Sequence, residues 1–218
     1  MSKEIIVPHG GYRKLKSYQT TKIIYDLALE FCRSFVDVKF RTIDQMVQAA
    51  RSGQQNIAEG SQASGTSRQT ELKLVSVPRA SLEELLLDYE DFLRQRGLLL
   101  WVKDDPRTQE LRQLAHKASR SYATNKSYMA NPETAADCAA VLIHQASFLL
   151  DQQLRSLEEG LVKSGDMPER VRHARRQEIR DQFLGAASGE DERFFSEHNM
   201  VRLPSGRVVS KDELNKDQ

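Results

Sequence analysis

The stretch DQMVQAARSGQQNIAEGSQASGTSRQTELKL, residues 44–74, decides the fold of this chain. Its apolar side chains up to Ile57 fall on one arc of a helix at about 100° per residue, and its polar side chains fall on the opposite arc. Gly60 and the run SQASGTS then predict a helix end followed by a connection. The stretch holds no arranged acid, base or nucleophile, which an enzyme would need, so it predicts architecture rather than catalysis.

Apolar residues at spacings of three and four predict four long helices in all. These helices span residues 17–38, 42–61, 67–96 and 132–163. Ser67 is the expected N-cap of the third. Pro78 lies inside that helix, where proline removes a hydrogen bond, and it predicts a kink without a break because the apolar pattern continues past it. Four long amphipathic helices predict an all-α protein, an antiparallel four-helix bundle.

The rest of the chain is expected to be shorter or less regular. A short helix is predicted over residues 108–122 and a loop over residues 125–132. A charged helix over residues 167–183 is followed by a weakly ordered tail, in which residues 200–210 could form a hairpin. The predicted domains are a basic N-terminal arm, the four-helix bundle and a C-terminal suffix, over residues 1–16, 17–163 and 164–218.

Composition limits the function classes. The 218 residues carry 32 Lys and Arg against 31 Asp and Glu, a net charge of +1. A near-neutral total argues against a strongly basic nucleic-acid-binding protein, although a local basic patch is compatible with it. No apolar run is long enough for a membrane span, and the N-terminus lacks the apolar core of a signal peptide. We therefore expect a cytoplasmic protein without membrane contact.

Residues that could bind a metal or perform catalysis are sparse. Cys32 and Cys138 fall on apolar helix faces, as small buried side chains do. None of the five histidines has a second ligand type at a spacing that suggests zinc, so we expect no metal and no cofactor. Arg112 and His116 are too close together for the arginine–histidine motif of helical ribonucleases, which disfavours a nuclease.

Two features of the helices indicate contacts between subunits. The apolar arc of residues 132–163 is unusually wide, which predicts burial on more than one side, and association with other copies is the simple explanation. The candidate interface residues are apolar positions off the core arc of the third helix and glutamines on the polar arc of the second: Leu72, Val77, Leu87, Gln48 and Gln55.

Charged candidates fall into three groups. Glu71 lies inside the apolar arc of the third helix, where a carboxylate is either paired or has a raised pKa, and it is expected to be a structural buried group. Arg51, on the polar arc of the second helix, could contact phosphate or a partner, or form a salt bridge on the surface or at a subunit interface. The other nucleic-acid or partner-binding candidates are Arg13, Lys14, Lys16, Arg170, Arg172, Arg175 and Arg176.

Four runs carry a resemblance to a known family. They are YQTTKIIYDLALEFC (18–32), RTIDQMVQAARSGQQNIAEG (41–60), TELKLV (70–75) and RASLEELLLDYEDFLRQRGL (79–98). Over about residues 12–163 the chain resembles the bacterial four-helix-bundle family. That family includes proteins encoded in intervening sequences of large-subunit rRNA and Avd, the accessory variability determinant of diversity-generating retroelements. The C-terminal charged helix resembles the suffix of one of its subgroups.

The resemblance implies a homopentamer and, for the retroelement branch, binding to a reverse transcriptase and to RNA or DNA. Pro78 and the near-neutral charge depart from the family pattern. The favoured hypothesis is a non-enzymatic homo-oligomeric scaffold or accessory protein that binds a protein or RNA partner. The alternative is a nucleic-acid-binding accessory factor of a reverse transcriptase.

Overall fold

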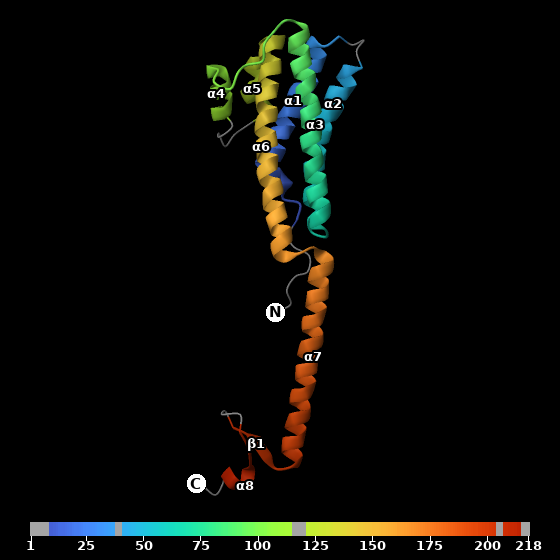
Figure 1. Cartoon of the computed structure of the whole chain (residues 1–218), viewed down its shortest axis with the longest axis vertical. Helices are drawn as coiled ribbons and strands as arrows, with labels where there is room; N and C mark the ends of the chain where they lie inside the picture. The colour runs from blue at the N-terminus through green and yellow to red at the C-terminus, as the bar shows by residue number, and fades with distance from the viewer. Residues whose placement is uncertain (1–8, 38–40, 115–120, 204–206, 215–218) are drawn as a thin grey trace. The chain divides into compact units, whose positions relative to one another are not determined.

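The computed structural model describes residues 9–37, 41–114, 121–203 and 207–214. Helices dominate it (Figure 1), which confirms the all-α class predicted from the periodicity. The elements in chain order are η1 (Tyr12–Lys14), α1 (Lys16–Phe35), α2 (Thr42–Ala63), α3 (Arg68–Gln95), α4 (Pro106–Leu114), α5 (Tyr122–Asn125), η2 (Lys126–Ala130), α6 (Pro132–Ser164), α7 (Met167–Glu197), β1 (Met200–Arg202), β2 (Val208–Ser210) and α8 (Lys211–Leu214). They fall into two compact units, which divide after Met167.

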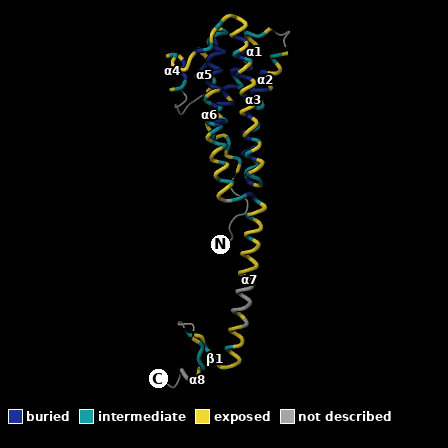
Figure 2. Tube along the Cα trace, in the orientation of Figure 1, coloured by how far each residue is buried: buried dark blue, intermediate teal, exposed yellow. Residues whose placement is uncertain are grey.

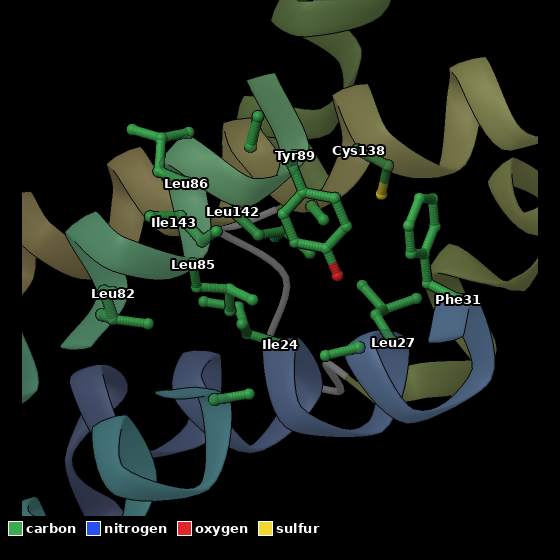
Figure 3. Close-up of a cluster of buried hydrophobic side chains, with 14 of the residues drawn as sticks. Ile24, Leu27, Phe31, Leu82, Leu85, Leu86, Tyr89, Cys138, Leu142 and Ile143 are labelled. Atoms are coloured by element: carbon green, nitrogen blue, oxygen red, sulfur yellow. The ribbon is translucent and has the colours of Figure 1, made fainter. Parts of the chain in front are cut away.

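Helices α1, α2, α3 and α6 enclose the hydrophobic core of the first unit. Helix α2 packs most extensively on α3, α3 also packs on α6, and α1 packs on both α2 and α6. Figure 3 shows Phe31 and Tyr89 within this core; their rings meet edge to face with centroids 4.9 Å apart. Full burial of an apolar side chain such as Phe31 stabilises the fold by roughly 1.5–3 kcal/mol. The antiparallel topology of the predicted bundle stays a prediction.

Gly60 has a different role from the one predicted. It does not end the second helix, because α2 continues to Ala63. A Cβ atom built on Gly60 would lie 3.0 Å from Cγ2 of Val75 and 3.3 Å from the carbonyl oxygen of Glu71. Gly60 therefore permits close approach of α2 to α3 inside the helix rather than a change of chain direction.

The ends of the predicted helices shift by a few residues. Helix α1 begins at Lys16, inside the predicted arm, and ends at Phe35. Ser67 caps α3 as expected, since its side-chain oxygen accepts a hydrogen bond from the Thr70 backbone N–H at 3.1 Å. Helix α3 continues through Pro78 without a break, while the predicted kink stays a prediction.

The segment between α3 and α6 is more regular than predicted. Residues 126–130 form the 3-10 helix η2 in place of part of the predicted loop. Asn131, the N-cap of α6, follows η2 directly. The predicted short helix begins earlier, at Pro106, and α4 ends at Leu114. Residues 115–120 of that prediction lie outside the described residues.

Part of the wide apolar arc of α6 is covered by this segment of the same chain. Asp137 lies nine residues from the core residue Ala146, on the opposite side of the helix at about 100° per residue. Asp137 is nevertheless fully buried, because Trp101, α4 and η2 cover this side of α6 within the same chain. Figure 2 shows the buried residues concentrated where α4 and α5 lie beside the long helices. This segment therefore accounts for burial around Asp137 within one chain, whereas Phe148, on the same helix, is 61% exposed. Association with other subunits stays a prediction.

The second unit contains more structure than the predicted weakly ordered tail. Helix α7 continues to Glu197, well past the predicted end, and is followed by an antiparallel pair in which Val201 faces Val209. Arg202 lies over the ring of Phe195 and forms an ion pair with Asp191 at 3.0 Å. These contacts hold the hairpin against the end of α7. Residues 204–206 of the predicted hairpin lie outside the described residues.

Candidate functional site

An open groove of about 980 Å³ lies between α2 and α3. Helix α2 and the residue before it contribute Arg41, Asp44, Gln48 and Ser52, among others, and α3 contributes Ser81, Glu84, Leu87 and Asp88. The spacing of four places Asp44, Gln48 and Ser52 along one stripe of α2. This stripe is the polar arc that the sequence predicted for the second helix.

Small residues bring the two helices close enough to form this groove. A Cβ atom on Gly53 would lie 3.2 Å from Cδ2 of Leu82, so glycine permits the approach. The hydroxyl groups of Ser52 and Ser81 are hydrogen-bonded at 2.9 Å. Asn56 donates a hydrogen bond to the backbone oxygen of Ser52 at 3.0 Å, within its own helix. The Ser52–Ser81 hydrogen bond therefore joins α2 to α3 within the lining of the groove.

The groove is acidic. Asp44, Glu84 and Asp88 line it, with Arg41 as the only cation among its lining residues in the described part of the chain. Burial raises the pKa of Asp88, and the neighbouring charges of Asp91 and Glu84 raise it further. Closely spaced carboxylates repel one another, so a cationic partner would relieve this repulsion and a nucleic-acid phosphate would add to it.

Only two of the predicted interface residues come together in this groove. Gln48 and Leu87 line it, and Leu87 is 54% exposed. Val77 is 40% exposed and Gln55 is exposed, but neither lines the groove, and Leu72 is half-buried on α3.

The predicted basic residues occupy separate places. Arg51 is exposed on α2 and does not line the groove. Arg13, Lys14 and Lys16 are exposed on η1 and at the start of α1, where the Arg13 guanidinium lies 5.4 Å from the Tyr12 ring centroid. The α7 candidates lie in the second unit: Arg170 is half-buried and Arg172, Arg175 and Arg176 are exposed.

Glu71 is buried, with 9% of its surface exposed. No hydrogen bond or ion pair to its carboxylate is found among the described residues. Burial raises the pKa of this carboxyl group, and the nearby charge of Arg68 opposes the shift. Of the two states expected for a carboxylate in an apolar arc, the structure therefore has the unpaired one with a raised pKa.

A second buried carboxylate, Asp137, is one that the sequence prediction missed. Its Oδ1 accepts a hydrogen bond from the Trp101 backbone N–H at 2.8 Å, while its Oδ2 is buried without a partner among the described residues. Burial raises the pKa of Asp137 to about 6. The sequence does mark Asp137, since this aspartate interrupts an apolar run. Its hydrogen-bond partner Trp101 is far away in sequence, so the pairing could not be predicted from local spacing.

The described residues contain no group of three or more His, Cys, Asp or Glu side chains that could hold a metal ion. None of the described helices is both long and apolar enough to cross a membrane. Comparison with known proteins finds no matching family model, no matching curated protein and no matching solved structure.

Proposed function

We propose that this chain is a non-enzymatic helical scaffold protein that self-associates, and that the groove between α2 and α3 holds part of a neighbouring subunit. The observation that carries the proposal is the exposed Leu87 beside Gln48 in a groove with three carboxylates. An apolar anchor with a polar, charged surround is typical of a protein–protein contact. The resemblance described above implies five subunits.

The proposed occupant of the groove is the basic N-terminal surface of another copy. Arg13 and Lys14 are exposed and cationic, which complements the carboxylates of Glu84 and Asp88. The two surfaces are different, so the contact is heterologous, and repeated contacts of this kind close into a ring when the rotation between subunits permits. The acidic groove also favours a protein occupant over a nucleic acid.

Native mass spectrometry of charge-reversed variants tests this proposal. We expect the wild type to have a mass near five times 24.9 kDa at micromolar concentration. Glu84→Lys with Asp88→Lys should lower the assembly to monomers, as should Arg13→Glu with Lys14→Glu. The chain with all four changes should reassemble, because both surfaces are reversed together.

The matched control reverses two exposed carboxylates that do not line the groove, Glu83→Lys with Glu158→Lys. This variant should keep the wild-type mass. A monomeric wild type, or an assembly that survives reversal of Glu84 and Asp88, would refute the proposed interface.

A second candidate function is nucleic-acid binding through the first half of α7, as an accessory factor of a reverse transcriptase. Residues 168–180 carry five arginines against two carboxylates. Of these arginines, Arg172, Arg175, Arg176 and Arg180 are exposed. Binding through phosphate contacts would weaken steeply as salt rises.

Fluorescence anisotropy with labelled RNA and DNA at several salt concentrations tests this second function. Changing Arg172, Arg175 and Arg176 to Gln should weaken binding and flatten its salt dependence. The control changes three exposed lysines of the first unit, Lys22, Lys73 and Lys103, to Gln, for the same loss of charge. Equal weakening by both triple variants would remove α7 as the specific site.

A further inference from the structure

A second cavity, of about 620 Å³, lies where residues 9–17 meet α2, α3 and α6. Its lining combines apolar side chains, among them Leu149 and Leu157, with hydroxyl and amide groups, among them Ser61 and Gln153. Glu71 also lines it. The volume lies within the range of cavities that bind small molecules, about 300–1,000 Å³.

The Glu71 carboxylate is the unusual group of this cavity. Only 9% of the Glu71 surface is exposed, and no hydrogen bond or ion pair to its carboxylate is found in the described part of the chain. Arg68 is the cation that affects it, but the Arg68 guanidinium donates a hydrogen bond to the Gly160 backbone oxygen at 2.7 Å. A carboxylate that has lost part of its hydration without gaining a hydrogen-bonded partner favours pairing with a cation delivered from solution.

We propose that this cavity binds a small aliphatic amine, with the ammonium group paired to Glu71 and the hydrocarbon part packed on Leu149 and Leu157. An ammonium group has three N–H donors, one or two for the carboxylate and the rest for hydroxyl and amide oxygens such as those of Ser61 and Gln153. A single carboxylate among neutral oxygens suits this ion better than a divalent metal, which takes several oxygen ligands, usually more than one of them charged.

Two other ionisable side chains line the cavity, His9 and Lys16. Both are exposed to solvent, whereas Glu71 is buried. Solvent screens charges at the cavity mouth much more than the charge of the buried carboxylate. The amine is therefore expected to bind with its charge at Glu71 and its chain toward the leucines.

Isothermal titration calorimetry on the full chain tests the site with n-hexylammonium chloride, and with 1-hexanol and hexanoate as neutral and anionic probes of the same length. We expect the ammonium ion to bind and the other two to bind at least about tenfold more weakly, since a charge-assisted pair is worth more than 1.4 kcal/mol. Affinity should rise with pH and then level off as Glu71 ionises.

Glu71→Gln should weaken hexylammonium binding at least about tenfold and remove the pH dependence. Glu83→Gln, an exposed carboxylate on the same helix that lines neither cavity, should leave both unchanged. Ser156→Leu would fill part of the cavity without touching the carboxylate, and it should also weaken binding. Thermal unfolding of each variant shows that it is folded.

The proposal is overturned if wild type fails to bind hexylammonium at 10 mM-scale concentrations, about the weakest range of a specific small-molecule site. Equal affinity for hexylammonium and hexanol, or for wild type and Glu71→Gln, would also overturn it. A pH dependence that persists in Glu71→Gln would overturn it as well, because Glu71 would then not be the group whose ionisation controls binding.

Discussion

The substitution Asp137→Asn is expected to stabilise this protein at neutral pH. Burial raises the pKa of Asp137 from its usual value of 3.8 to about 6. At 1.36 kcal/mol per unit, the buried charge costs about 3 kcal/mol once the group is ionised. Asparagine keeps an oxygen for the Trp101 backbone N–H and removes the charge. The asparagine Nδ2 takes the place of Oδ2, which is buried without a partner. The free-energy cost of one buried, unpartnered polar atom is therefore nearly the same in both proteins.

The sign of the pH dependence follows from the raised pKa. Between pH 3.8 and about 6 the folded state binds more protons than the unfolded state, so wild-type stability falls as pH rises through this window. Asp137→Asn does not lose stability in this way, because asparagine does not ionise. The free-energy difference between variant and wild type should therefore grow from pH 4 and reach a plateau above pH 6.

Urea unfolding followed by circular dichroism at pH 4, 5, 6, 7 and 8 measures this difference. In thermal unfolding at pH 8 the variant's Tm should exceed that of wild type by roughly 6–12 °C, at about 2–4 °C per kcal/mol. Asp104→Asn, an exposed carboxylate of the same segment, is the control and should change stability by less than about 0.5 kcal/mol. Parallel pH profiles for Asp137→Asn and wild type, or a less stable variant at pH 8, would refute the reasoning.

Three further substitutions test the packing, each by denaturant unfolding. Gly60→Ala should destabilise by about 1–3 kcal/mol because its Cβ would crowd Val75, whereas Gly189→Ala, with nothing within 4 Å of its Cβ, should be neutral or slightly stabilising. Asp166→Ala should cost about 1–2 kcal/mol at neutral pH, because Oδ1 accepts the N–H groups of Arg68 and Met167. These bonds lower the pKa of Asp166 despite burial, so this difference should shrink as pH falls below 3.8. Trp101→Ala should cost about 3–5 kcal/mol and, by uncovering α6, increase self-association measured by sedimentation.

The candidate groove was only partly predictable. The polar arc of the second helix placed Gln48 on the surface, and the off-core position of Leu87 placed it there too. Their presence in one groove depends on how far α2 and α3 are offset along each other, and no spacing within either helix encodes that offset. Val77 and Leu72 have similar sequence signals but lie outside the groove.

The sequence by itself determined the all-α class, the four long helices and the Ser67 cap, because helix periodicity and capping depend on residues within a few positions of one another. Only the tertiary structure showed that Gly60 permits helix contact, that Trp101 and α4 cover the outer side of α6, and that Glu71 lines a cavity. These features are distances between segments far apart in the chain. They are fixed by close packing of the whole core, which local patterns do not specify.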